Sequence, residues 1–284
     1  AATVRYLRIA HGELGRDDLA LVSYHMGIGN LQQVISDYGA QDEPPYVRLY
    51  FDSTPQRHAA AWRRLNALGD DSATYLWRVL AARAIMRLWR EDRSELARLD
   101  ELQTNKASAE EVLHPPDRTQ RFADPEALEA ARDDGDLVAL PGAPARLGFR
   151  IDRRMGELAP RLDARPALYR ALRPEARTLA RWMGAKVREI SRVPGYLTMT
   201  SAVRDERYQD LLVGTNPEAT SGYSLHTTGY AFDVLRRYRS RAQAVAFQFL
   251  LDRLQSLDLI AWVREPAAIH VTASKDAGTV EDPS

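Results

Sequence analysis

The stretch that decides the fold is Ser224-Leu225-His226-Thr227-Thr228-Gly229-Tyr230-Ala231-Phe232-Asp233. It places a histidine and a carboxylate seven residues apart, with a glycine between them. Two turns of one helix would also align the two side chains, but Gly229 and the β-favouring residues after it argue against a helix. We therefore expect a tight loop carrying His226, a bend at Gly229 that uses a positive φ or a close backbone approach, and a strand delivering Asp233.

A second histidine, His270, lies downstream in a short β-like run, 268–274. Two imidazoles and one carboxylate form a mixed nitrogen and oxygen set that suits Zn²⁺. Three protein ligands leave the fourth position open, as in a catalytic zinc site and unlike a structural one. The sequence therefore predicts a catalytic zinc site at His226, Asp233 and His270, with Ser224 placed to support a ligand residue or the loop backbone.

The pattern Ser-x-His-x-x-Gly-x-Ala-x-Asp, followed by a strand-borne histidine, resembles the zinc D-alanyl-D-alanine carboxypeptidase family (VanY-like). That family shares its fold with hedgehog signalling domains. Upstream, the run 197–204 and the following Gln209 resemble the family's strand, its Ser-x-x-Arg segment and its glutamine. The resemblance covers roughly residues 135 to 275. It implies the same three zinc ligands, an Arg204 that holds the substrate carbonyl or carboxylate, and Gln209 and Ser224 as substrate-binding residues.

The general base departs from the family pattern. Family members usually place a glutamate three residues before the last histidine, or a histidine two before it, and here those positions are Ala267 and Ala268. The nearest acid is Glu265, which Pro266 follows. A bend there would bring the carboxylate to the zinc site, where it would act as general base. The alternative is an ordinary surface acid, and the sequence leaves both open.

The run 22–31, Val-Ser-Tyr-His-Met-Gly-Ile-Gly-Asn-Leu, resembles the Ala-Tyr-Asn-x-Gly-x-Gly-x-Val segment of soluble lytic transglycosylases, which have a lysozyme-like helical fold. The resemblance covers about residues 1 to 40 and implies that Tyr24 lines a sugar cleft. The family asparagine is His25 here. The family's catalytic glutamate precedes this segment, and Glu13 lies in a turn at the wrong place. We therefore expect a partial, non-catalytic lobe, either degenerate or without its first half.

Composition excludes several classes of function. The chain has 284 residues, is 45% apolar, and balances 39 basic against 39 acidic residues, so it can bury a sizeable core and has no net field favouring nucleic acid. It has no cysteine, which excludes disulfides, cysteine zinc sites and thiol nucleophiles. No apolar run approaches the ~20 residues of a membrane span. The start at Ala1 without Met indicates processing or a cut from a longer protein.

The expected architecture is α+β: an all-α, partly lysozyme-like lobe, then a small antiparallel sheet flanked by helices and carrying the zinc site. We place the helical lobe at 1–100, a polar connector at 101–134, the zinc peptidase-like domain at 135–276 and a loose tail at 277–284. Apolar periodicity predicts helices within 59–99, 169–190 and 245–257. Strands are expected at 197–201, 260–263 and 268–274, the last two as a hairpin that brings Glu265 and His270 to one end.

The function predicted is that of a zinc-dependent peptidoglycan peptidase of the D-alanyl-D-alanine carboxypeptidase or endopeptidase type. By the resemblance, its partners are peptidoglycan stem peptides and glycan strands in the periplasm or cell wall of a bacterium. Two alternatives stay open: a non-catalytic peptidoglycan-binding or scaffolding protein, and a lytic transglycosylase whose glutamate lies outside this chain. The other histidines, which show no ligand spacing, are expected at the surface or in packing: His11, His25, His58 and His114.

Overall fold

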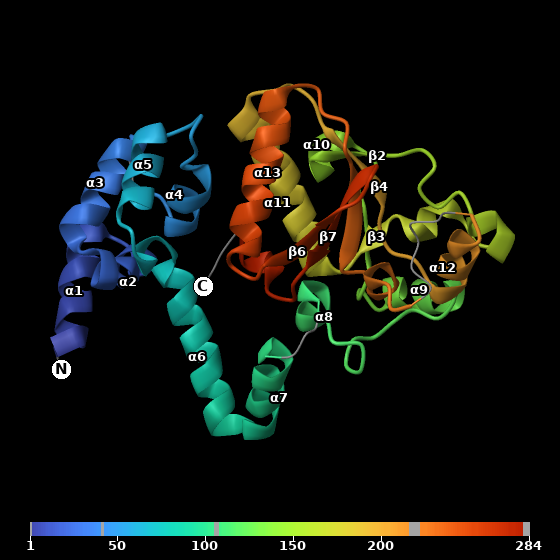
Figure 1. The fold of residues 1–284 in the computed structure, drawn as a ribbon, viewed down its shortest axis with the longest axis horizontal. Coiled ribbons are helices and arrows are strands. Elements are labelled where there is room, and N and C mark those ends of the chain that lie inside the picture. Colours follow the sequence, from blue (N-terminus) through green and yellow to red (C-terminus); the bar gives the residue numbers. More distant parts are fainter. Residues whose placement is uncertain (1, 41–42, 105–107, 216–221, 281–284) are drawn as a thin grey trace. The chain divides into compact units, whose positions relative to one another are not determined.

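The protein is a mixed α+β chain of two compact units, residues 1–105 and 106–284 (Figure 1). The computed structural model describes residues 2–40, 43–104, 108–215 and 222–280. Most of the connector expected at 101–134, from residue 106 onward, belongs to the second unit. Within the described residues, no helix combines the length and the apolar character needed to cross a membrane.

The first unit is helical, as expected. Its helices are α1 (Ala2–Leu14), α2 (Asp17–Met26), α3 (Ile28–Tyr38), α4 (Tyr46–Asp52), α5 (Ala59–Ala67), the 3₁₀ turn η1 (Asp71–Thr74), α6 (Tyr75–Glu91) and α7 (Arg93–Thr104). Apolar side chains spaced three or four residues apart meet in one core. Its fully buried members include Leu19, Val22, Leu31, Val34, Leu49, Phe51 and Leu65.

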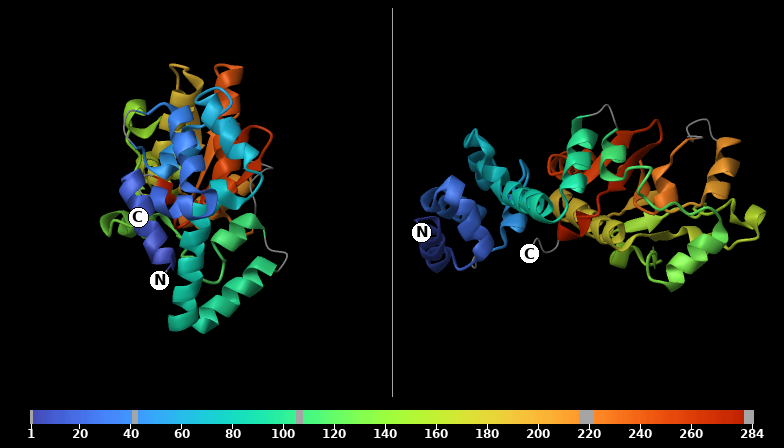
Figure 2. Two further views of the ribbon diagram at one scale, coloured as in Figure 1. Left: turned by 90° about the vertical axis from the view of Figure 1, so that its left-hand side faces the viewer. Right: turned by 90° about the horizontal axis from the view of Figure 1, so that it is seen from below.

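Helices α6 and α7 leave this core as a V-shaped pair, visible in Figures 1 and 2. Apolar residues recur along α6, yet Ile85, Met86 and Trp89 are about half exposed. The Arg93 guanidinium lies 4.3 Å from the centre of the Trp89 ring and covers part of it. The helix forms where the periodicity predicts it, but most of its apolar face lies outside the unit's core.

The second unit is built on a five-stranded sheet in the order β2-β4-β5-β7-β6. Its strands are β2 (Phe149–Ile151), β4 (Leu197–Ser201), β5 (Ala231–Leu235), β6 (Ile260–Arg264) and β7 (Ala268–Ala273). The sheet was expected to be antiparallel throughout, but β2 pairs with β4 in parallel. The helix α11 (Pro174–Ser191) lies between those two strands in sequence and supplies the crossover that a parallel pair needs. The β6–β7 hairpin forms as predicted.

Helices α11 and α13 (Arg241–Gln255) lie side by side against the sheet (Figure 1). Both are amphipathic, and the apolar faces that they bury include Leu179, Met183 and Val187 of α11 and Phe247, Leu250 and Leu254 of α13. A side chain at Gly184 is excluded because its Cβ would lie 2.6 Å from the backbone of Gly148, so α11 approaches the β2 segment closely. Phe232 and Val234 of β5 are also fully buried.

The second unit also contains several shorter elements. They are α8 (Ala109–Leu113), α9 (Pro125–Asp133), the short pair β1 (Val138–Ala139) and β3 (Ala171–Leu172), α10 (Pro144–Leu147), the 3₁₀ turns η2 (Ala159–Leu162), η3 (Pro166–Tyr169), η4 (Leu225–Thr228) and η5 (Ala277–Val280), and α12 (Glu206–Val213). The loose tail expected at 277–284 is wrong for its first part, because Ala277 and Val280 are buried and η5 packs against α11. Residues 281–284 lie outside the described residues.

Candidate metal centre

The loop around His226 has the predicted form of turn, glycine bend and strand. Ser224 O accepts hydrogen bonds from Thr227 N at 3.0 Å and from Thr227 Oγ1 at 2.7 Å, which closes η4. Gly229 ends the turn with φ +80°, a left-handed conformation that favours glycine. A Cβ at that position would also lie 2.8 Å from Leu137. The bend therefore fixes how far β5 and its Asp233 lie from His226.

The sheet register brings His226, Asp233 and His270 together. Asp233 of β5 pairs directly with His270 of β7, so both side chains project from the same face of the sheet. Their closest atoms, Asp233 Oδ1 and His270 Nδ1, lie 2.8 Å apart. One ligand atom from each of the three residues lies within 4.8 Å of the others, and all three residues are buried.

His226 presents an unprotonated nitrogen to the Asp233 carboxylate. Its Nδ1 lies 2.7 Å from the carbonyl oxygen of Ala202, which can only accept, so Nδ1 carries the proton. Burial, with help from the Arg204 charge, lowers the pKa of His226 to about 4, so the ring is neutral and Nε2 has a free lone pair. His226 Nε2 lies 3.2 Å from each of the two carboxylate oxygens of Asp233. Two acceptors thus face each other in a buried site, and a cation between them would satisfy both.

Asp233 supplies the negative charge of the cluster. Burial would raise its pKa, but the hydrogen bond and positive charge of His270 oppose burial and hold the pKa well below its usual range. Its second oxygen accepts a bond from Arg204 Nη2 at 3.3 Å. A buried, ionised carboxylate beside two imidazole nitrogens is a donor set that Zn²⁺ takes in proteins. These residues therefore fit a divalent metal ion.

Arg204 contacts the cluster at Asp233, and Gln209 contacts Arg204. The backbone N–H of Arg204 donates to His226 O at 3.0 Å, which ties the arginine to the turn that carries His226. Its guanidinium donates to Gln209 Oε1 at 2.9 Å and to Ser201 Oγ at 2.8 Å. Burial lowers the Arg204 pKa, while the charges of Asp233, Tyr208 and Glu265 act in the opposite direction. In this arrangement Gln209 orients the guanidinium.

Glu265 lies in the turn of the β6–β7 hairpin, where its N–H donates to Ala268 O at 3.0 Å. Arg236, the residue after β5, donates through Nη1 to the Glu265 carbonyl oxygen at 2.7 Å and so ties the turn to the end of that strand. Of the charges that raise the Arg204 pKa, that of Glu265 acts most weakly. Its role as general base stays a prediction.

The other two predicted substrate-binding residues, Ser224 and Tyr24, lie in different units of the chain. Ser224 is buried at the start of η4, and the contacts given above come from its carbonyl oxygen. Tyr24 lies on α2 in the first unit, 46% exposed, with its ring in edge contact with Tyr6. The sequence-predicted site is thus divided between the two units, and the metal-binding candidates all belong to the second.

Sequence reasoning missed Glu110, an acid on α8. Its Oε1 lies 2.9 Å from His270 Nε2 and accepts a bond from Thr272 Oγ1 at 2.6 Å. The segment Ser108-Ala109-Glu110-Glu111 carries the Ser-x-x-Glu signature of a helix start, and the capping box forms. That signature predicts a helix but not its contact with a strand about 160 residues away, so no local signal could place Glu110 here.

Comparisons of this chain with protein-family models, curated proteins and solved structures found no match. The resemblance to the zinc carboxypeptidases therefore remains a hypothesis carried by the residues named above.

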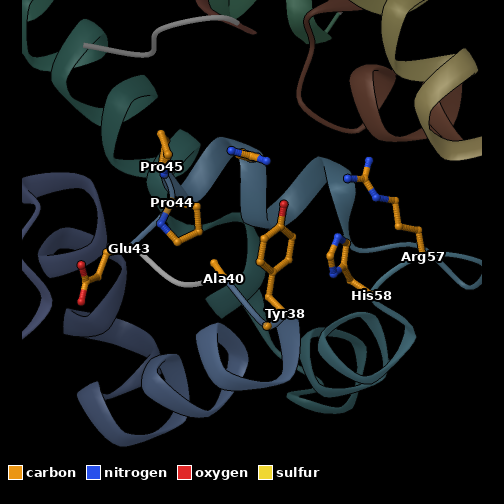
Figure 3. Close-up of a pocket in the computed structure, with 9 residues that line it drawn as sticks. Tyr38, Ala40, Glu43, Pro44, Pro45, Arg57 and His58 are labelled. Carbon is orange, nitrogen blue, oxygen red and sulfur yellow. The ribbon is translucent and has the colours of Figure 1, made fainter.

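The first unit holds a pocket of about 430 Å³ beside the end of α3 (Figure 3). Tyr38 donates to the buried Asp52 at 3.1 Å and stacks on the His58 ring at 3.9 Å between ring centres. Arg48 and Arg57 also line the pocket, and Arg48 lies 3.5 Å from Asp52. Burial raises the pKa of Tyr38 to about 12, so its hydroxyl stays protonated. The pocket offers aromatic, cationic and hydrogen-bonding groups within one unit.

Proposed function

We propose that the second unit is a zinc-dependent peptidase that acts on peptide stems of bacterial peptidoglycan, of the D-alanyl-D-alanine carboxypeptidase or endopeptidase type. The observation that carries the proposal is the buried cluster of His226 Nε2, Asp233 and His270 Nδ1, in which a lone pair and a carboxylate face each other. Such a contact is unfavourable without a cation. A bound Zn²⁺ would polarise a peptide carbonyl and acidify water.

The residues around the cluster have separable roles in this proposal. His226 and His270 hold the metal with Asp233, and Ala202 O fixes the tautomer of His226. Arg204, held by Gln209 and Ser201, offers positive charge to a substrate carboxylate or to a developing oxyanion. Glu265 is the proposed acceptor of the water proton, which it would pass to the leaving amine.

The substrate class rests on the resemblance of Ser224 to Asp233 and of the Arg204 segment to zinc D-alanyl-D-alanine carboxypeptidases. The test uses the full chain, purified with Zn²⁺, and synthetic stem peptides that end in D-alanyl-D-alanine, with products identified by mass spectrometry. We expect release of D-alanine or a shorter peptide, lost in His226→Ala and kept in the control His11→Ala, whose side chain is half exposed. A zinc-loaded protein that leaves stem peptides and whole peptidoglycan uncut would contradict the proposal.

Glu265→Gln tests the general base separately. We expect a loss of about 10²-fold or more in kcat with zinc retained, since a positioned base contributes 10²–10⁴-fold. Hydrolysis at the wild-type rate would remove Glu265 from the mechanism and leave the metal centre in place.

A second candidate function is non-catalytic binding of peptidoglycan by the first unit, favoured by the pocket beside Tyr38 and His58. Stacked rings and arginines suit acetylated, carboxylate-bearing ligands. Sedimentation of the full chain with purified peptidoglycan tests this function. We expect weaker retention for Arg48→Gln and Arg57→Gln and no change for Arg63→Gln, which is exposed on α5. Equal retention of all three variants would exclude the pocket.

A further inference from the structure

Glu110 reaches the metal-binding cluster from outside the sheet. It lies on α8, about 160 residues before His270 in the chain, and its side chain is 19% exposed. The carboxylate meets the His270 ring at Nε2, whereas the other ring nitrogen, Nδ1, faces Asp233. The two carboxylates therefore hold opposite sides of one imidazole.

We propose that Glu110 is a positioning residue for the metal: it accepts the Nε2–H of His270 and so directs the Nδ1 lone pair toward the cation shared with His226 and Asp233. The inference rests on the metal site of the proposed function. A histidine that binds a metal through one nitrogen keeps its proton on the other, and a carboxylate partner there fixes the ring and raises its basicity. Since Glu110 approaches from the Nε2 side, its geometry favours support of the ring over direct coordination.

The Glu110 carboxylate is itself fixed in place. Thr272 Oγ1 donates to the same oxygen at 2.6 Å, and Thr272 lies on β7 two residues after His270. At the start of α8, the Ser108 side chain accepts from Glu111 N, and the Glu111 side chain accepts from Ser108 N. The Thr272 bond thus ties the carboxylate to the strand that carries His270, and the capping box orders the turn of α8 that carries Glu110.

The residue after α8 anchors the other end of the segment. His114 is fully buried, its Nε2 donates to Ala273 O at 2.6 Å, and its ring stacks on Tyr230 at 4.0 Å. Tyr223 donates its hydroxyl to His114 O at 2.9 Å. The segment is therefore held against β7 at Glu110 itself and again at His114, which gives the carboxylate the fixed position that a supporting residue needs.

The test measures Zn²⁺ affinity of the full chain by competition with a chromogenic chelator. Loss of a carboxylate partner of this kind typically lowers metal affinity 10–100-fold, and we expect this loss for Glu110→Ala. Glu110→Gln keeps a neutral acceptor and should fall between Glu110→Ala and wild type. The matched control is Glu111→Ala, which removes a cap from the same helix but no contact to His270, and should stay within about twofold of wild type.

A second readout is the visible absorption of the Co²⁺-substituted protein, which reports the geometry of the coordinating atoms. We expect altered d–d bands in Glu110→Ala and unchanged bands in Glu111→Ala. Wild-type affinity and bands in both Glu110 variants would overturn the inference, and so would an equal loss in Glu111→Ala. Because affinity is measured without a substrate, a zinc-binding protein that cleaves no peptide would contradict the proposed peptidase and leave the role of Glu110 standing.

Discussion

At the scale of single residues, Asp233 is the carboxylate that contacts Arg204, His226 and His270. It accepts from Arg204, faces His226 Nε2 and bonds His270 Nδ1. In the metal-free protein both nitrogens of His270 have carboxylate partners, and although burial lowers its pKa, these bonds raise it to about 10. Without metal, the charges of Arg204 and His270 are therefore both compensated by contact with the Asp233 carboxylate.

Replacing Asp233 by Asn should destabilise the metal-free protein as well as abolish metal binding. Removing one partner from a buried ion pair costs about 3 kcal/mol or more because the other charge is left buried. Urea unfolding of chelator-treated protein measures the effect, with Asp210→Asn on the exposed side of α12 as control. If Asp233→Asn were as stable as the wild type, the Asp233 carboxylate would not stabilise the charges of Arg204 and His270.

Gly229→Ala tests the bend between His226 in the turn and Asp233 on β5. The added Cβ meets Leu137 at 2.8 Å, and a left-handed φ costs a residue with a Cβ about 1–2 kcal/mol. We expect a stability loss of that order together with weaker metal binding, since His226 and Asp233 are placed by this bend. Gly278→Ala, where the new Cβ meets nothing within 4 Å, is the control and should be near neutral. A neutral Gly229→Ala would contradict the steric argument.

At the scale of elements, local patterns predicted the parts that carry their own signals. The loop at His226, the strand at Asp233 and the β6–β7 hairpin form as expected, because turn glycine, strand propensity and alternation are local properties. The parallel β2–β4 pair and the contact of α8 with β7 were missed. Both depend on which distant segments meet, and apolar periodicity does not encode that choice.

His114, at the end of α8, should make stability depend on pH. Burial lowers its pKa to about 4, whereas in the unfolded chain the pKa is near 6.5. Between those values the unfolded state binds a proton that the folded state excludes, so stability falls as pH drops from about 6.5 to 4. The full effect is about 3 kcal/mol.

The measurement compares the pH dependence of urea unfolding for wild type and His114→Gln. The variant keeps a side-chain donor for Ala273 O but does not titrate, so its stability should change less between pH 6.5 and 4. Parallel curves for the two proteins would show that His114 is not buried as a neutral ring.

At the scale of the whole molecule, the division into units assigns all metal-binding candidates to residues 106–284. The segment 108–134 is part of that unit's core: Phe122, Leu128 and Ala131 pack in one apolar cluster with Leu137 and Tyr169. Phe122 N also donates to the carbonyl oxygen of Thr227, in the turn that carries His226, at 2.8 Å. A polar composition made this stretch resemble a connector, although Phe122, Leu128 and Ala131 are buried.

Two fragments test this division. The fragment 106–284 should fold and bind Zn²⁺ with the affinity of the full chain, because it keeps every candidate ligand and Glu110. The fragment 135–284, which follows the boundary suggested by sequence, loses Glu110, His114 and Phe122 and should melt at lower temperature and bind Zn²⁺ more weakly. Circular dichroism melts and chelator competition measure both. Equal behaviour of the two fragments would contradict the role given to residues 108–134.

The central claim is that His226, Asp233 and His270 together bind one metal ion. Elemental mass spectrometry of the purified full chain, after incubation with Zn²⁺ and removal of the excess, tests it most directly. The account predicts about one zinc per chain in the wild type and in His11→Ala, and none in His226→Ala. A wild type without metal, or a His226→Ala protein that keeps its zinc, would contradict it.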